Sequence, residues 1–284
     1  MNALTDIKYV KTLLGEAGFT FSKQLGQNFL VNPSVCPKMA DMCGCEGIGV
    51  IEIGTGVGVL TTELAKRAKR VVAIELDERL RPVLDVTLKD YDNVTVIFGD
   101  VLKIDLEKVL SDYFDGMEVC VCANLPYYIT SPIVMSLLES KLPFKAITVM
   151  VQKEAAQRLC ADMGTRKCGA VTAAVSYYAK AEKLFSVERG SFIPSPNVDS
   201  AVIRLTVHRN PPVAANDEKM LFSVIRAAFS QRRKTLPNSI ASGTPFTKEQ
   251  IASALERCSI KPTARAEELT LSQFADISNT LAEV

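Results

Sequence analysis

The sequence predicts an α/β fold with a seven-stranded, largely parallel sheet and a small all-helical C-terminal domain. Short β-branched runs alternate with helical patterns between residues 50 and 151, which is typical of β-α-β units. Asn210, Pro211 and Pro212 then mark a linker, and amphipathic helical patterns follow it. We therefore expect two domains, residues 1–208 and residues 209–284.

Each predicted strand is a short apolar run that ends at a turn. Five parallel strands are expected at residues 50–54, 70–75, 94–98, 119–123 and 146–151. Asp77 stands at the N-cap position of the helix after the second strand. Residues 170–178 fit a helix or a strand, and we interpret them as a helix. It leads into two final strands, at residues 181–187 and 200–207.

The composition is that of a globular protein with a substantial core. Of 284 residues, 48% are hydrophobic and 23% are charged, and the net charge of +1 identifies no partner. The chain contains no run of about 18 apolar residues, so we expect no membrane span. Asp6 and Lys8 stand where a secretory signal needs an apolar segment, so we expect a cytoplasmic protein.

The eight cysteines do not predict a metal site. Cys43 and Cys45 are spaced C-x-C instead of C-x-x-C, as are Cys120 and Cys122. The only histidine, His208, is distant from both pairs in sequence. We expect Cys120 and Cys122 to be buried strand residues and the thiols to be reduced.

A glycine-rich turn follows the first strand, and acids end the next two. Gly54, Gly56 and Gly58 let the backbone turn tightly and approach a ligand. Their G-x-G-x-G spacing is shorter than the dinucleotide pattern and suits a ligand without a pyrophosphate. Glu75 lies 21 positions after Gly54, where a carboxylate can accept ribose hydroxyls, and Asp100 is placed to accept an adenine amino hydrogen. Helix caps or solvated turns are the alternative for both acids.

This turn and the two acids resemble the motifs of class I S-adenosylmethionine-dependent methyltransferases. The three glycines look like the first motif, and Glu75 and Asp100 look like the acids of the second and third. The resemblance implies a Rossmann-like class I methyltransferase sheet and S-adenosyl-L-methionine as cofactor.

Asn124, Leu125, Pro126 and Tyr127 end the fourth strand at the same edge of the sheet. The amino nitrogen of adenine is a poor nucleophile because its lone pair is delocalised into the ring. The Asn124 side chain and the Leu125 carbonyl can accept its two hydrogens and aim the lone pair at a methyl group. Pro126 fixes the carbonyl direction, and Tyr127 or Tyr128 can stack on an unpaired base. In the alternative interpretation, Asn124 is a cap and the tyrosines pack in the core.

Three further motifs narrow the resemblance. They are Gln27-Asn28-Phe29-Leu30, Phe192-Ile-Pro-Ser-Pro-Asn-Val-Asp-Ser and Phe229-Ser-Gln-Arg-Arg-Lys. Together with the glycine turn and Asn-Leu-Pro-Tyr, they resemble the ribosomal RNA adenine N6,N6-dimethyltransferases, and within them the small-subunit dimethyladenosine transferases (the kasugamycin-sensitivity enzymes). The motifs run from about residue 20 to residue 240.

The resemblance implies a role for each motif residue. Asn28 and Leu30 lie in the segment that closes over the cofactor, and Phe192 faces the target base. The residues that line the cofactor pocket in this family correspond to Gly54, Glu75, Asp100 and Asn124. In the alternative interpretation, Phe192 belongs to the core, and Gln24 and Asn28 are turn residues.

The implied substrate is a pair of adjacent adenosines in a hairpin loop near the 3′ end of 16S ribosomal RNA, in the 30S subunit or its precursor. Unpaired bases in a loop are splayed out at low cost. We expect the protein to be a monomer. Residues 223–240 contain no acid, so we expect the basic residues there to contact RNA phosphates: Arg226, Arg232, Arg233 and Lys234. A solvated helix face is the alternative for this basic patch.

Three other functions remain as alternatives. The first is a 23S ribosomal RNA adenine dimethyltransferase of the macrolide-resistance type, and the long C-terminal region favours the small-subunit enzyme over it. The second is a non-catalytic nucleic-acid-binding relative, against which the intact Asn124–Tyr127 motif argues. The third is a DNA adenine or protein glutamine methyltransferase, for which Leu125 in place of a proline and the arginine-rich helix are unfavourable.

Overall fold

The computed structural model describes residues 3–19 and 28–283 and divides the chain into two compact units. Unit 1 comprises Met1–Ala156 and Glu182–Val207, and unit 2 comprises Gln157–Ala181 and His208–Val284. Gln157–Ala181 thus packs with unit 2, although it lies within the expected first domain; the functional division of the chain stays a prediction. Gln24 and Gln27 lie outside the described residues.

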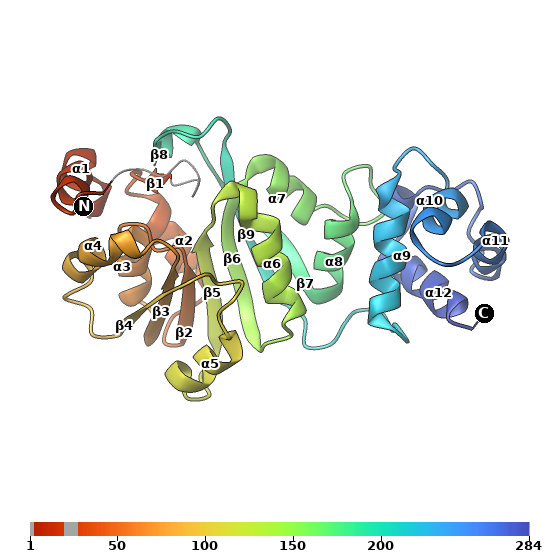
Figure 1. Cartoon of the computed structure of the whole chain (residues 1–284), viewed down its shortest axis with the longest axis horizontal. Helices are drawn as coiled ribbons and strands as arrows, with labels where there is room; N and C mark the ends of the chain where they lie inside the picture. The colour runs from red at the N-terminus through yellow and green to blue at the C-terminus, as the bar shows by residue number, and fades with distance from the viewer. Residues whose placement is uncertain (1–2, 20–27, 284) are drawn as a thin grey trace. The chain divides into compact units, whose positions relative to one another are not determined.

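Unit 1 is built around a seven-stranded sheet with the order β4-β3-β2-β5-β6-β9-β7 (Figure 1). The strands are β2 (Gly49–Ile53), β3 (Arg70–Glu75), β4 (Val94–Phe98), β5 (Val119–Asn124), β6 (Phe144–Gln152), β7 (Ala179–Val187) and β9 (Ser200–Val207). The first five are parallel, and β9 runs antiparallel to β6. The predicted α/β class and the seven strands are therefore confirmed.

A second, two-stranded sheet was not predicted. It pairs β1 (Phe29–Leu30) with β8 (Phe192–Ile193) in antiparallel register. The two strands lie about 160 positions apart in sequence, and each is only two residues long. No periodic pattern can reveal a strand of that length.

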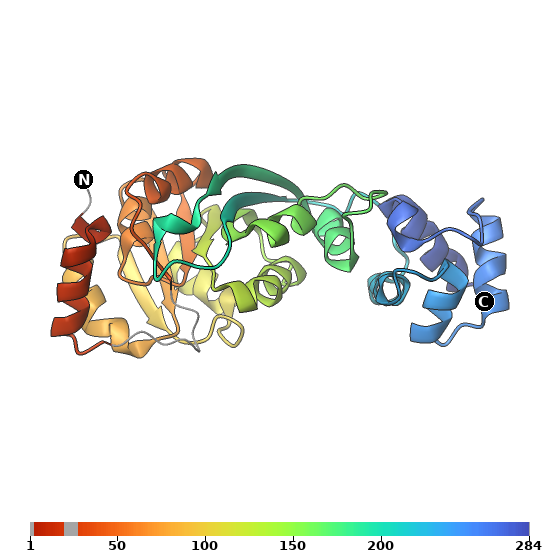
Figure 2. The same ribbon diagram turned by 90° about the horizontal axis from the view of Figure 1, so that it is seen from above.

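Helices cover both faces of the sheet of unit 1 (Figures 1 and 2). The α-helices are α1 (Ile7–Glu16), α2 (Val35–Cys43), α3 (Val59–Ala65), α4 (Arg81–Thr87), α5 (Leu106–Phe114), α6 (Thr130–Glu139) and α7 (Lys153–Leu159). The short 3₁₀ helices are η1 (Ala3–Thr5), η2 (Glu78–Leu80), η3 (Tyr127–Ile129) and η4 (Arg189–Ser191). The central strands are buried on both faces and mostly apolar, as is typical of a covered parallel sheet. Asp77 caps η2 as predicted, accepting a hydrogen bond from the Arg79 N–H at 3.2 Å.

The regular elements of unit 2 are helices, including the last three residues of α7, except for the first residues of β7. Its helices are α8 (Ala170–Tyr178), α9 (Glu218–Ser230), α10 (Leu236–Gly243), α11 (Lys248–Arg257), η5 (Ala266–Glu268) and α12 (Leu271–Leu281). Asp217, Thr247 and Thr270 cap α9, α11 and α12 with their side chains, which satisfies amide groups at the helix starts. Residues 170–178 are helical, as interpreted from the sequence.

The cysteines Cys120 and Cys122 are fully buried in β5, as predicted. Across residues 3–19 and 28–283, no group of three or more His, Cys, Asp or Glu side chains is arranged to hold a metal ion. None of the helices in this part of the chain is long and apolar enough to cross a membrane.

Candidate functional site

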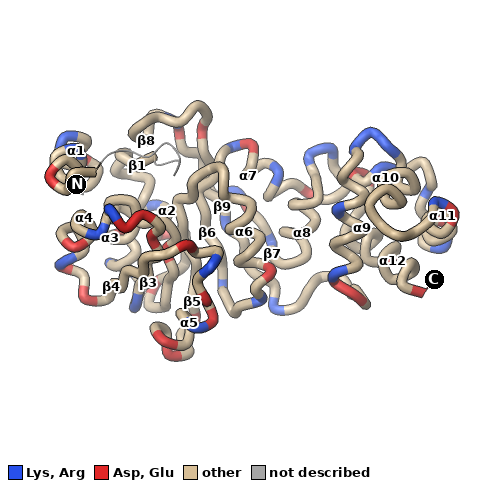
Figure 3. The backbone as a smooth tube through the Cα atoms, in the orientation of Figure 1, with Lys and Arg blue, Asp and Glu red and all other residues tan. Residues whose placement is uncertain are grey.

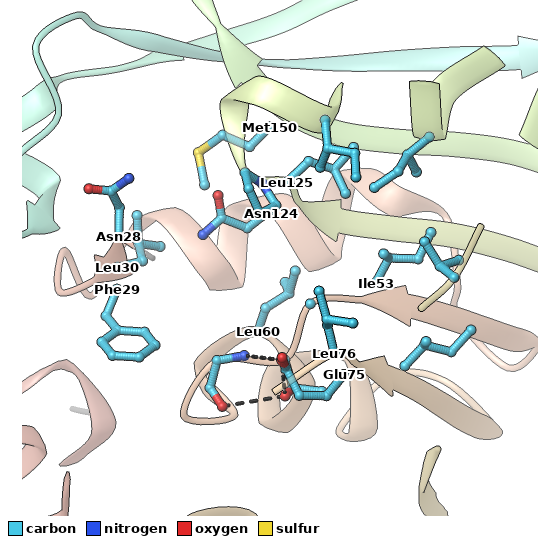
Figure 4. A pocket seen from close by; sticks show the side chains of 18 of the residues that line it. Asn28, Phe29, Leu30, Ile53, Leu60, Glu75, Leu76, Asn124, Leu125 and Met150 are labelled. Atoms are coloured by element: carbon cyan, nitrogen blue, oxygen red, sulfur yellow. Dashed lines mark hydrogen bonds between the residues drawn. The ribbon is translucent and has the colours of Figure 1, made fainter. Parts of the chain in front are cut away.

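A pocket in unit 1 lies at the carboxyl ends of the parallel strands (Figure 4). It has an empty volume of about 1220 Å³, counting space open to solvent. The predicted site residues that line it are Asn28, Leu30, Gly54, Gly56, Glu75, Asp100, Asn124, Leu125, Pro126, Tyr127 and Phe192. Side chains from segments far apart in sequence therefore meet in one cavity.

The glycine turn connects β2 to α3 and lines the pocket with Gly54 and Gly56. Gly54 and Gly56 have φ values of 80° and 54°, which L side chains rarely adopt. A Cβ on Gly56 would also lie 3.2 Å from the Phe29 ring. Gly58 does not line the pocket: it is the N-cap of α3, and a Cβ there would meet Thr87 at 3.1 Å.

Glu75 faces the glycine turn, and dashed lines in Figure 4 end at its carboxylate. One carboxylate oxygen accepts hydrogen bonds from the Thr55 hydroxyl at 2.9 Å and from the Gly56 N–H at 3.2 Å. The other accepts from the Asp77 N–H at 2.9 Å. The carboxylate is thus buried but fully oriented, so it links the end of β3 to the glycine turn of β2.

Asp100 follows β4 and lines the same cavity. Its carboxylate accepts a hydrogen bond from the Leu102 N–H at 3.1 Å and lies 3.8 Å from the Lys103 ammonium. Asp100 is half-buried, whereas Lys103 is largely exposed. Asp100 therefore stabilises its own turn while presenting a negative charge to the pocket.

Asn124 ends β5, and its amide points into the cavity beside Met150 (Figure 4). The following Leu125 is 2% exposed, so its side chain anchors the turn in the core. The Pro126 carbonyl accepts a hydrogen bond from the Thr130 hydroxyl at 3.2 Å, which holds the turn against α6. The Asn-Leu-Pro-Tyr segment is thus held at both ends.

The two tyrosines after Pro126 have different environments. Tyr127 lines the pocket, is half-buried, and shares a hydrogen bond of 2.7 Å between its Oη and the Ser200 Oγ. Burial raises the pKa of Tyr127, the hydrogen bond to Ser200 lowers it, and the charge of Asp199 raises it. Tyr128 also lines the pocket, but its side chain is 59% exposed.

Phe192 is buried, with 3% exposure, yet it lines the pocket. It pairs with Leu30 in the two-stranded sheet, which places the segment after Asn28 against it. From the sequence, Asn28 and Leu30 are expected at the cofactor and Phe192 at the target base. The β1–β8 pairing brings the two segments together.

Several pocket residues were missed. Phe29 and Thr55 lie within two of the motifs identified in the sequence, so their position next to predicted site residues could have indicated them. Met150 lines the pocket from β6, and only the rule that ligands bind at the carboxyl ends of parallel strands points to it. Leu60 lines it from α3 and looks like an ordinary core residue in sequence.

Glu52 lies in the middle of β2 and is 0% exposed. Within the described residues, neither of its carboxylate oxygens has a hydrogen-bond partner. Burial raises the pKa of Glu52 from its ordinary value of 4.5 to about 8, against a lowering by the nearby Thr61 hydroxyl and with a further rise from the charge of Glu75. Strand β2 therefore carries a largely neutral carboxyl at pH 7, two residues before Gly54.

The predicted basic residues belong to unit 2. Arg226 is exposed on α9, and Arg232, Arg233 and Lys234 are exposed in the turn between α9 and α10, where Figure 3 shows a run of positive charge. One Arg232 nitrogen donates to the carbonyls of Arg166 and Cys168, at 2.8 Å and 3.1 Å. Arg232 therefore ties two loops of unit 2 together.

Comparison with known proteins gives consistent matches. The family model described as ribosomal RNA adenine dimethylase matches residues 18–283. A protein of Geobacillus thermodenitrificans named ribosomal RNA small subunit methyltransferase A is 50% identical, over 95% of this chain and 94% of its own. A Bacillus licheniformis protein of the same name is 48% identical, over 96% of each chain.

Two solved structures share the fold. A dimethyladenosine transferase from Plasmodium falciparum is 27% identical with a TM-score of 0.71, covering 87% of this chain and 95% of its own. The 23S rRNA methyltransferase ErmE is 25% identical with a TM-score of 0.68, covering 90% of this chain and 100% of its own.

Glu52→Gln is expected to make stability less dependent on pH. Because the folded pKa of about 8 lies above the unfolded value, the contribution of Glu52 to stability is fully present below pH 4.5 and is lost as pH rises towards 8. Each unit of difference between the folded and the unfolded pKa lowers the free energy of unfolding by about 1.4 kcal/mol once the group is ionised in both states. Chemical denaturation from pH 4.5 to pH 9 measures the gap between variant and wild type, which should widen with pH and then level off. Parallel curves would contradict this assignment, and Glu107→Gln, at an exposed position in α5, is the control.

Proposed function

Because the chain belongs to the ribosomal RNA adenine dimethylase family, we propose that it transfers methyl groups from S-adenosyl-L-methionine to the N6 amino group of adenosines in small-subunit ribosomal RNA. The observation that carries the proposal is the pocket of unit 1 at the carboxyl ends of the parallel strands. It combines a glycine turn and two carboxylates with Asn124, Leu125, Pro126 and Tyr127 at the end of β5. The first group suits a nucleoside cofactor, and the second suits a planar amine.

The pocket residues fit the proposed cofactor in chemistry. Glu75 and Asp100 supply carboxylates for ribose hydroxyls and an amino group, and the turn at Gly54 and Gly56 brings backbone close to the cavity. Apolar side chains, among them Ile53, Leu60, Leu76 and Met150, provide a wall for an adenine ring. When bound, S-adenosyl-L-methionine supplies an electrophilic methyl group on a sulfonium. The residues proposed to hold it also include Asn28 and Leu30.

The chemistry assigned to the chain is orientation of the target amine. The Asn124 side-chain oxygen and the Leu125 backbone carbonyl accept the two amine hydrogens, which favours a pyramidal nitrogen with its lone pair directed at the methyl group. Tyr127 and Phe192 enclose the base ring on the pocket wall. The proton on nitrogen leaves after transfer, so no side chain has to act as a general base.

The proposed substrate is the pair of adjacent adenosines near the 3′ end of 16S ribosomal RNA, presented by the 30S subunit or its precursor, with a role in 30S biogenesis. Relatives named for the small subunit are 48–50% identical, whereas the 23S enzyme is 25% identical, which favours the small subunit. The intact Asn124–Tyr127 segment supports a catalytic rather than a binding-only role. We also propose that the protein is a cytoplasmic monomer.

The test is methyl transfer from labelled S-adenosyl-L-methionine to undermodified 30S particles, followed by mapping of the labelled nucleotides. We expect two adjacent adenosines near the 3′ end to carry the label, with 50S particles as the matched control. Labelling of 50S particles alone would replace this proposal with the 23S alternative.

Glu75→Ala is expected to weaken S-adenosyl-L-methionine binding by about 1–3 kcal/mol, because the variant cannot accept charge-assisted hydrogen bonds from the ribose. Calorimetry on folded protein measures the affinity. Glu78→Ala, which removes an exposed carboxylate from η2, is the control and should bind normally. Unchanged affinity in Glu75→Ala would remove Glu75 from the cofactor site.

Arg233→Gln with Lys234→Gln is expected to flatten the salt dependence of RNA binding. For each phosphate that the protein no longer neutralises, the slope of log K against log salt falls by about 0.7–0.9. A salt titration with a small-subunit RNA fragment measures the slope, and Lys248→Gln with Lys261→Gln is the control pair from elsewhere in unit 2. An unchanged slope would return the basic patch to its alternative interpretation as a solvated face.

Asn124→Ala is expected to lower methyl transfer by about two to three orders of magnitude, as for an oriented hydrogen bond in the transition state. Thermal stability and RNA affinity should stay near wild type. Single-turnover transfer to undermodified 30S particles at saturating cofactor isolates the chemical step, with Asn216→Ala as control. A loss of less than about tenfold would reduce Asn124 to a cap at the strand end.

A further inference from the structure

The two aromatic residues proposed to face the target base are both tied to the start of β9. The Ser200 Oγ shares its 2.7 Å hydrogen bond with the Tyr127 Oη, and Ser200 is 0% exposed. The neighbouring Asp199 accepts a hydrogen bond from the Arg189 N–H at 3.1 Å through its side chain. Arg189 begins η4, which runs directly into Phe192.

The start of β9 is itself firmly held. The Asp199 carbonyl accepts a hydrogen bond from the Lys153 N–H at 3.0 Å, and Ser200 is the register partner of Gln152 on β6. Asp199 and Ser200 are therefore fixed by the main sheet. Neither of them lines the pocket, so their side chains do not reach its contents directly.

The loop that precedes β9 is closed by its own hydrogen bonds. The Ser195 hydroxyl donates to the Arg189 carbonyl at 2.9 Å, which holds the two sides of the loop together. The bond from Arg189 to Asp199 attaches this loop to the main sheet. The Asp199 carboxylate is thus one attachment of the segment that carries Phe192 to the main sheet.

We propose that Asp199 and Ser200 are positioning residues for the target-base half of the pocket. Ser200 holds the ring of Tyr127 through its hydroxyl, and Asp199 holds the segment that carries Phe192. This inference rests on the proposed function, because it takes the two aromatic side chains as the walls that receive the base. A ring held in one orientation loses less entropy when a base stacks on it.

The same segment also reaches the cofactor half of the pocket. The Val31 N–H donates to the Ser191 carbonyl at 2.8 Å, and the Asn32 side-chain amide donates to the Ser191 hydroxyl at 3.1 Å. Phe192 pairs with Leu30 in the β1–β8 sheet. Asp199 therefore anchors a chain of contacts that ends beside the residues proposed to close over the cofactor.

The test is a double-mutant cycle of Ser200→Ala and Tyr127→Phe. Ser200→Ala should lower single-turnover methyl transfer to undermodified 30S particles about five- to tenfold, as expected when one hydrogen bond is removed, with unchanged affinity for S-adenosyl-L-methionine. The double variant should be no slower than the slower single variant, because both changes remove the same bond. Ser239→Ala removes a buried hydroxyl from α10 and should leave the rate unchanged.

A second readout separates positioning from stability. In a ¹³Cζ-tyrosine NMR titration, Ser200→Ala should raise the pKa of Tyr127, because the hydrogen bond that lowers it is gone. A rate within twofold of wild type, multiplicative losses in the cycle, or an unchanged pKa would each overturn the proposal. If Ser200→Ala does not fold, Asp199→Ala takes its place: it frees the Arg189 N–H and should slow transfer fivefold or more, and a wild-type rate would overturn the role of Asp199.

The positioning role and the proposed function fail in different ways in these experiments. If the wild-type protein labels no RNA, the proposed function fails. If wild type is active and Ser200→Ala is equally active, the positioning role alone fails.

Discussion

The pairing of β2 with β3 on one side and β5 on the other is the interaction on which the pocket depends. In the register, Ile53 is level with both Ile74 and Ala123. The next residues of β3 and β5, Glu75 and Asn124, therefore flank the glycine turn at one edge of the sheet. A one-residue slip of either strand would turn one of these side chains to the other face. The backbone ladder thus brings the proposed cofactor and chemistry residues together.

Strand β2 also carries a buried carboxyl group whose oxygens have no hydrogen-bond partner among the described residues. Glu52 stands on β2, which is buried on both faces, and its pKa of about 8 keeps the carboxyl largely neutral at pH 7. Glu75, on the adjacent strand, accepts three hydrogen bonds from the polypeptide. The two carboxyl groups therefore differ in role because their partners differ. Glu75 orders the glycine turn, while Glu52 is accommodated as an uncharged group within β2.

The sequence predicted the features that repeat or stand next to each other along the chain. The strands follow from apolar runs, and the pocket edge follows from where those runs end at Gly54, Glu75, Asp100 and Asn124. Local sequence does not reveal contacts between distant segments. The β1–β8 pairing and the Tyr127–Ser200 hydrogen bond join residues more than 70 positions apart. Such contacts depend on side-chain geometry that only the folded chain defines.

The internal role of Arg232 was equally hidden, because in sequence nothing distinguishes it from Arg233. In unit 2 its guanidinium donates to two backbone carbonyls of the loop before α8, which makes Arg233 and Lys234 the more direct candidates for phosphate contacts.

Dimethylation places different demands on the pocket at its two steps. Under the proposed function, an unmodified amine offers two hydrogens, one each for the Asn124 side chain and the Leu125 carbonyl. After the first transfer only one N–H remains, so one of these two acceptors has no partner on the amine. The orientation of the nitrogen then depends more on Tyr127 and Phe192, the two side chains proposed to enclose the base ring. The hydrogen bond between Ser200 and Tyr127 and the attachment of the Phe192 segment to Asp199 therefore matter most for the second methyl group.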